Sequence, residues 1–115
     1  MKLIELTVPT LQGSETLTAI QVTEHFAIHD TVGARFSISI THMPSLRRMA
    51  MVEGLALAVA ASEAWQSIGI DWSFAEPEGI AAMSDDHRAQ ARLIRDFAED
   101  GFLGALRNFK PGASG

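Results

Sequence analysis

Apolar and polar residues alternate in three stretches of the N-terminal half: residues 2–8, 16–29 and 34–42. A period of two places successive side chains on opposite faces, which is typical of a β-strand with one buried face. Turn-forming residues separate the stretches, with Gly13 in the first gap and Asp30 and Gly33 around the second. The pattern therefore predicts a three-strand antiparallel meander.

The lengths of the two loops decide which side chains share a face, because a one-residue shift in register turns a whole strand over. Three-residue loops at 12–14 and 30–32 place the apolar residues of all three strands on one side. The opposite, polar side then carries His25 opposite Ser37 and Thr23 opposite Ser39. We expect helices to cover the apolar side and solvent to cover the polar side.

The longest apolar-rich segment runs from Pro44 to Ile68 and predicts one long central helix. Pro44 suits a first helical turn, because its missing N–H would have no partner there, and Gly69 suits a helix end. At about 100° per residue, the apolar side chains fall on two arcs. The first arc is Met51, Val52, Leu55 and Val59, and the second is Leu57, Ala61, Trp65 and Ile68. We expect the sheet to cover one arc, and either C-terminal helices or a partner chain to cover the other.

After this helix, three alternating apolar residues predict a fourth strand parallel to the third: Ile70, Trp72 and Phe74. Ser84 is a suitable N-cap for a helix that ends near residue 100 and has the apolar stripe Leu93, Ile94, Phe97 and Ala98. Gly101 separates it from a short helix at 102–109. The predicted fold is α+β in the order β-β-β-α-β-α-α, a single domain of residues 1–109 with a disordered tail at 110–115.

Composition restricts the function more than any motif does. The chain has 115 residues, no cysteine and a formal net charge of −5. The lack of cysteine excludes disulfides, thiolate metal sites and cysteine nucleophiles. An acidic chain with few lysines disfavours nucleic acid and anionic membranes as partners. We expect no metal, no cofactor and no membrane partner. The first residues carry Glu5 and no long apolar core, which favours the cytoplasm, and the excess of arginine over lysine resembles a bacterial composition.

Two clusters of polar residues are candidate ligand-binding sites. The first is the polar sheet face, where His25 could act as a general base and Arg35 could hold a charged ligand beside Ser37. The second lies at the predicted helix start, where His42, Arg47 and Arg48 could hold an anion. A structural role is open for each as well: a solvated sheet face for the first, and a histidine hydrogen-bonded to nearby backbone for the second.

Two further patterns carry less information. His25 and His29 lie four residues apart, but in a strand this separation spans about 13 Å, which is too far for one metal ion. Arg88, Arg92 and Arg95 line one side of the C-terminal helix, but acidic residues follow two of them at helical pairing distance. Mixed charges of this kind indicate a solvated face rather than a phosphate-binding one.

These observations favour two functions of different classes. The first is a non-catalytic interaction module that associates with itself, with the second arc of the central helix as its interface: Leu57, Ala61, Trp65 and Ile68. The second is a small-molecule-binding protein or small enzyme with a pocket at the sheet–helix junction or on the polar sheet face. No catalytic motif in the sequence favours the enzyme.

Overall fold

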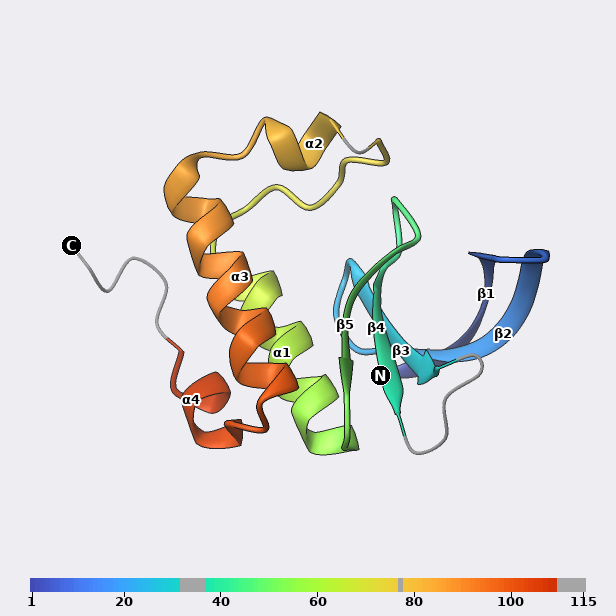
Figure 1. Ribbon diagram of the computed structural model, residues 1–115, viewed down its shortest axis with the longest axis horizontal. Helices are drawn as coiled ribbons and strands as arrows, with labels where there is room; N and C mark the ends of the chain where they lie inside the picture. Colours follow the sequence, from blue (N-terminus) through green and yellow to red (C-terminus); the bar gives the residue numbers. More distant parts are fainter. Residues whose placement is uncertain (32–36, 77, 110–115) are drawn as a thin grey trace.

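The computed structural model describes residues 1–31, 37–76 and 78–109. Five strands of this described part precede the first helix: β1 (Lys2–Thr10), β2 (Gly13–Gln21), β3 (Phe26–Asp30), β4 (Ile38–His42) and β5 (Arg47–Val52). Each strand pairs antiparallel with the next one in sequence (Figure 1). The α+β class and the antiparallel meander are therefore confirmed, but the meander has five strands, so the predicted element order is wrong.

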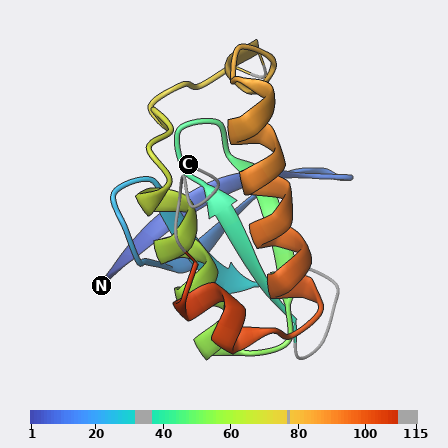
Figure 2. The ribbon, with the colours of Figure 1, turned by 90° about the vertical axis from the view of Figure 1, so that its left-hand side faces the viewer.

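Within the described residues, four helices follow the sheet: α1 (Leu55–Ser67), α2 (Glu78–Ala81), α3 (Asp85–Glu99) and α4 (Leu103–Arg107). Seen from the helical side, α1 and α3 lie next to each other in front of the sheet (Figure 2). The hydroxyl of Ser84 accepts a hydrogen bond from the N–H of His87, so the predicted N-cap of α3 is confirmed. The predicted tail at 110–115 lies outside the described residues.

The single helix expected from Pro44 to Ile68 is wrong in its first half. Residues 47–52 form the edge strand β5, and α1 begins only at Leu55, after Gly54 in an extended conformation (φ −177°). Pro44 lies in the turn between β4 and β5 rather than in a first helical turn. The side chains of Ala50 and Val52 are buried while Met51 between them is exposed, which is strand alternation. Helix-forming residues in this segment become a strand because β4 offers it backbone partners.

The fourth strand expected at Ile70–Phe74 is also wrong, because this segment has no strand pairing. Its alternation still reflects burial: Trp72 is buried, and Ile70 and Phe74 pack partly against the core. The backbone carbonyl of Trp72 accepts a hydrogen bond from the imidazole of His42, 2.6 Å away. Two side chains, His42 and Asp71, therefore hydrogen-bond backbone groups of this segment, where a neighbouring strand would otherwise do so.

The first hairpin has a two-residue turn, Leu11–Gln12, instead of the expected three-residue loop. Thr10 pairs with Gly13, whose φ of 124° is readily adopted only by glycine. This one-residue difference turns β1 over relative to the expectation. Leu6 and Val8 therefore face away from the helices, where they form a second apolar cluster with Ala19 and Ala27.

The expected continuous strand at 16–29 is interrupted at residues 22–25, where the chain reverses between β2 and β3. Farther on, His29 lies opposite Ser39, so the expected pairs His25–Ser37 and Thr23–Ser39 are wrong. Ile28 still pairs with Ile40 and faces the helices. The predicted faces of β3 and β4 are therefore correct. The loop expected at 30–32 is not, because Asp30 still belongs to β3.

The main core lies between the sheet and the helices and is built around aromatic rings. Phe26, Trp65 and Trp72 are each at most 1% exposed. The ring of Phe26 stacks on Trp65, with centroids 5.7 Å apart, and meets Trp72 edge-on at 4.9 Å. Aromatic pairs of this geometry add to the stabilisation from buried area. Phe26 thus connects β3 to both α1 and the segment that follows it.

Replacing Phe26 with alanine should lower the free energy of unfolding by about 3–5 kcal/mol, because the vacated volume lies between two rigid indole rings. The matched control is Phe102→Ala, whose side chain is 56% exposed; its cost should stay below about 1 kcal/mol. Urea denaturation followed by circular dichroism measures both values. Equal costs for the two variants would contradict this description of the core.

Candidate ligand groove

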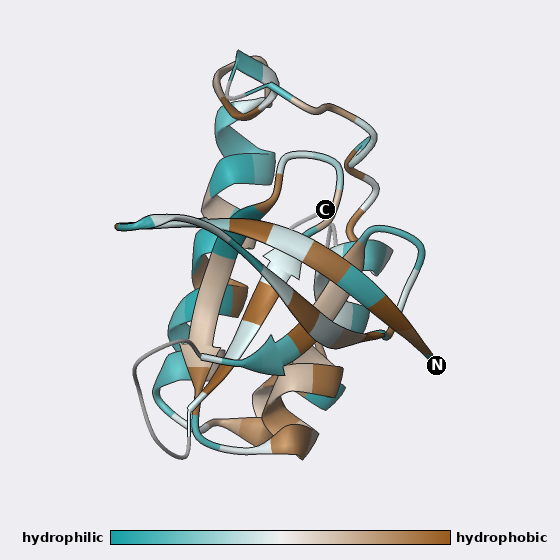
Figure 3. Cartoon of the chain, turned by 90° about the vertical axis from the view of Figure 1, so that its right-hand side faces the viewer, coloured by the Kyte–Doolittle hydropathy of each residue, from teal (hydrophilic) through white to brown (hydrophobic). Residues whose placement is uncertain are grey.

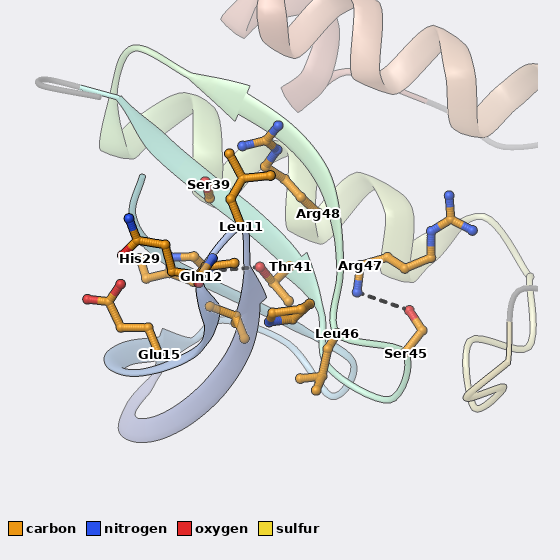
Figure 4. A pocket seen from close by; sticks show the side chains of 13 residues that line it. Leu11, Gln12, Glu15, His29, Ser39, Thr41, Ser45, Leu46, Arg47 and Arg48 are labelled. Atoms are coloured by element: carbon orange, nitrogen blue, oxygen red, sulfur yellow. Dashed lines mark hydrogen bonds between the residues drawn. The ribbon is translucent and has the colours of Figure 1, made fainter. Parts of the chain in front are cut away.

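A groove of about 1000 Å³ lies on the sheet face that points away from the helices. Its floor is formed by β3 and β4, one wall by the tip of the β1–β2 hairpin, and the other wall by β5 and the turn before it (Figure 4). The hairpin curls over the sheet, as Figure 1 shows from the side. The groove is therefore on the polar sheet face, one of the two places where the sequence favoured a pocket, and not at the sheet–helix junction.

Hydroxyl groups and one imidazole make up the floor of the groove. The side chains of Ser39 and Thr41 are each 2% exposed. The Ser39 hydroxyl is hydrogen-bonded to the Thr31 hydroxyl at 2.8 Å, and the Thr41 hydroxyl to Nε2 of His29 at 2.8 Å. Buried hydroxyls that are fully hydrogen-bonded hold one geometry, because breaking a bond would leave a polar group without a partner.

The hydrogen bonds of His29 fix its neutral tautomer. Its Nδ1 lies 2.9 Å from the backbone carbonyl of Asp30, which can only accept, so Nδ1–H is the donor. In the neutral ring Nε2 then accepts, and the Thr41 hydroxyl donates to it. This chain of donor, imidazole and carbonyl resembles a nucleophile with its general base. Because Thr41 is buried, its hydroxyl cannot reach a substrate, and its role is to position the ring of His29.

A second such chain lies in the turn between β4 and β5. The Ser45 hydroxyl donates to Nδ1 of His42 at 2.7 Å, because Nε2–H of the same ring donates to the carbonyl of Trp72. Burial is the main cause that lowers the pKa of His42, against the opposing effect of the hydrogen bond to Trp72, and the charge of nearby His25 lowers it further. The next residue, Leu46, has a φ of 59°, an uncommon conformation that keeps its side chain at the rim of the groove.

A bulge in the sheet places the charged side chains. The register shifts between Ile40 and Thr41, so that Thr41 pairs with Arg48 and His42 with Arg47. Paired residues share a face of the sheet. Arg48 therefore extends over the groove, whereas Arg47 extends away from it (Figure 4). Across the groove, the hairpin wall carries Glu15.

Neither Arg48 nor Glu15 belongs to an ion pair within the part of the chain that the structure describes. The two ion pairs found there both lie within α3, Arg88 with Asp85 and Arg95 with Asp96. The groove thus offers one positive and one negative side chain from facing walls. A ligand that carries charges of only one sign would be repelled by one of these two side chains. A ligand with one positive and one negative group could pair with both.

The structure does not bring the predicted ligand set together. Arg47 borders the end of the groove, but its side chain extends away from it, and His42 lies on the sheet face under the helices. Arg47 belongs to β5, so the anion site expected at a helix start does not form. The structural alternative for His42 is correct, since both its ring nitrogens are hydrogen-bonded within the chain.

His25 and Ser37 lie apart from the groove and from each other. The imidazole of His25 contacts the Gln66 amide of α1 at 3.0 Å, and its backbone N–H donates to the same side chain at 2.9 Å. Ser37 accepts a hydrogen bond from the Thr31 hydroxyl, 3.2 Å away. Arg35, the third member of the expected site, lies outside the described residues.

The second arc of α1 is covered by the chain itself. Ala61, Trp65 and Ile68 are buried in the main core, and Leu57 is partly buried against it. The indole N–H of Trp65 donates to the carbonyl of Ala91 in α3, 3.0 Å away. A charged substitution on this arc would therefore disrupt the monomer, and a surface for self-association has to lie elsewhere.

Sequence reasoning gave three groove residues no role in this site: His29, Glu15 and Arg48. Strand alternation placed His29 on the polar face, where it was considered only as a metal ligand, and Arg48 was assigned with Arg47 to the anion site at a helix start. Glu15 had no comparable signal. The positions of Glu15 and Arg48 depend on the two-residue turn and on the bulge, which a period-two pattern does not reveal.

Comparisons with known proteins leave the assignment to the geometry. No protein-family model matches the chain, and neither curated proteins nor solved structures gave a match. Within the described residues, no group of three or more histidine and acidic side chains could hold a metal ion. No helix in that part of the chain is long and apolar enough to cross a membrane.

The lowered pKa of His42 makes stability depend on pH. The unfolded chain takes up a proton near pH 6.5, the ordinary pKa, whereas the folded chain resists protonation until a lower pH. The free energy of unfolding should be highest above pH 6.5 and should fall as the pH drops through that window. We expect Tm to decrease by several degrees between pH 7.5 and pH 5.5 in a calorimetric scan.

His42→Gln should flatten this dependence, because glutamine can donate to the Trp72 carbonyl and accept from Ser45 without titrating. The control is His87→Gln at the start of α3, which should keep the slope of the parent chain. A pH profile of His42→Gln as steep as that of the parent chain would rule out His42 as the titrating group.

Proposed function

We propose that this chain is a non-catalytic interaction module whose groove binds an extended peptide segment with one acidic and one basic side chain. The observation that carries the proposal is the pair of opposite charges on facing walls, Arg48 and Glu15, neither of them in an ion pair within the described residues. An acidic side chain of the ligand would pair with the arginine, and a basic one with the glutamate.

The remaining lining suits a peptide better than a small metabolite. A volume of about 1000 Å³ is at the upper end for a small-molecule pocket. Leu11 at the hairpin tip is fully exposed and Leu46 is 36% exposed, so apolar side chains border the groove. Apolar anchors are among the features that recognition of an extended chain uses.

The hydroxyl groups of Thr41 and Ser45 are better placed to support ligand binding than to act in catalysis. The Thr41 hydroxyl donates to His29 and is buried, and the Ser45 hydroxyl donates to His42 on the other side of the sheet. A nucleophile has to reach the substrate while its base takes the proton. These hydroxyl groups instead stiffen the floor and the end of the groove, which lowers the entropic cost of binding.

Selection from a phage library of random heptapeptides against the immobilised protein should enrich sequences that carry an acidic and a basic residue. The affinity of one selected peptide is then measured by fluorescence anisotropy. Arg48→Ala should weaken binding by about 10-fold or more, the loss expected for a charge-assisted hydrogen bond. The adjacent Arg47→Ala, which points away from the groove, should change the Kd less than about 3-fold.

A variant in which the charges of Glu15 and Arg48 are exchanged tests the same mode of recognition. The double variant Glu15→Arg, Arg48→Glu keeps both charges but reverses their positions, so it should select peptides in which the order of acidic and basic residues is reversed. Selection of the same peptides by the double variant, or equal affinities of Arg48→Ala and the parent chain, would refute the proposed mode of recognition.

A second proposed function is self-assembly, which the shape of the sheet favours. Helices α1 and α3 pack against β3, β4 and β5, whereas the β1–β2 ribbon extends beyond them (Figure 1). A two-stranded ribbon is marginally stable on its own, and an open edge strand is a template for another chain. The edge of β1 is therefore the surface through which we propose that the chain associates.

Light scattering on a sizing column, over a 100-fold range of protein concentration, tests self-assembly. We expect a molar mass of twice 12.4 kDa at high concentration and a decrease towards 12.4 kDa on dilution. A mass of one chain at every concentration would exclude assembly and would leave the peptide groove unaffected.

A further inference from the structure

β1 is the terminal strand of the sheet and pairs with β2 alone. In Figure 3 it crosses the front of the molecule, with apolar and polar residues alternating along it and no other segment in front of it. Leu3 is 74% exposed at this edge. The edge therefore combines free backbone groups with an uncovered apolar side chain.

The turn determines which backbone groups of β1 point to the open edge. Thr10 and Gly13 flank a two-residue turn, so they must exchange both hydrogen bonds of a bonded pair. Bonded and non-bonded pairs alternate along an antiparallel ladder. The even-numbered residues of β1 are thus bonded to β2, and the N–H and C=O groups of Leu3, Glu5 and Thr7 point outward. Pro9 shares this parity, so its missing N–H costs the ladder nothing.

We propose that a second copy of this chain pairs with β1, antiparallel, around a two-fold axis at Ile4. This inference rests on the second proposed function, self-assembly, and names its surface and register. A two-fold axis perpendicular to the sheet keeps each face on the same side, so directly opposed residues must have the same parity. The outward groups then bond Leu3 of one copy to Glu5 of the other, and the reverse.

Two registers farther along β1 are each disfavoured by one residue, and an axis at Leu3 would pair only residues 2–4 of the strand. An axis at Glu5 would place the two Glu5 carboxylates directly opposite each other, and like charges in this position are destabilising. An axis at Leu6 would pair Leu3 with Pro9, which has no N–H to donate. The axis at Ile4 avoids both problems, and it also places Glu5 opposite the exposed Leu3 rather than opposite another charge.

Apolar contacts favour the same register. Ile4 is partly exposed at the border of the second apolar cluster, and the axis brings it against Ile4 of the second copy. On the other face, the two Leu3 side chains become diagonal neighbours across the new ladder. The second copy would thus cover the apolar groups that the monomer leaves at this edge, and both grooves would open on the same side of a continuous sheet.

Single-cysteine variants can determine the register, because the chain contains no cysteine of its own. With the axis at Ile4, residues 4 of the two copies form a non-hydrogen-bonded pair with Cα atoms about 4.5 Å apart, within the range of a disulfide. Ile4→Cys should therefore form a covalent dimer under mild oxidation, seen on a non-reducing gel. Glu5→Cys and Leu6→Cys, which report the registers with the axis at Glu5 and at Leu6, should stay mostly monomeric.

Glu5→Pro tests the edge without a cross-link. The N–H of Glu5 points outward, so proline there leaves the bonds to β2 intact and removes a donor to the second copy. This variant should be monomeric by light scattering at concentrations where the parent chain is a dimer, with an unchanged circular dichroism spectrum.

The outcomes separate the inference from the function on which it rests. Efficient cross-linking at residue 5 or 6 in place of residue 4 would overturn the register. A dimer that persists in Glu5→Pro would show that assembly uses another surface, so the inference would fail while self-assembly stands. A parent chain that is monomeric at every concentration, with no cross-linking at residue 4, would reject both.

Discussion

The position of the helices on the sheet depends on Trp72. Its indole N–H donates to the carbonyl of Trp65 in the last turn of α1, 2.7 Å away, and its own carbonyl accepts from the imidazole of His42 in β4. A buried indole N–H without a partner would be costly, so this arrangement is strongly specified. Through these two bonds and the ring of Phe26, the end of α1 is fixed to the centre of the sheet.

The two faces of the sheet are stabilised differently. The helical face buries aromatic and branched side chains at high density, whereas the other face has a small apolar cluster at one end and hydrogen-bonded hydroxyl groups at the other. That second cluster, around Leu6 and Val8, holds the curled hairpin over the sheet. The groove exists because the hairpin is anchored there, and its floor is polar because β3 and β4 present His29, Ser39 and Thr41 to the same side.

Two local irregularities shape the groove that we propose as a recognition surface. The bulge after Ile40 puts Arg48, rather than Arg47, on the groove face of the sheet. The left-handed conformation of Leu46 keeps an apolar residue at the rim. Bulges and strained residues are often found where a fold directs a side chain to a particular task. Both proposed contacts, the peptide in the groove and the second copy at β1, use parts of the sheet that the helices leave uncovered.

The sequence by itself determined the features that depend on near neighbours. The alternation predicted strands at residues 2–8 and at 38–42, the described part of the stretch 34–42, and Ser84 with the apolar stripe after it predicted α3. These predictions hold because period and capping are local properties of the chain. The negative charge and the lack of cysteine likewise required no structure.

Only the tertiary structure decided the features that depend on what each segment packs against. Residues 47–52 form a strand because β4 lies beside them. Residues 70–74 form none, because their apolar side chains pack on the core and the carbonyl of Trp72 accepts its hydrogen bond from His42. One residue in the first turn determined which face received Leu6 and Val8, and one bulged residue determined which arginine entered the groove. A sequence pattern fixes parity within a strand, but the register between strands is set by their contacts, and the groove is a product of register.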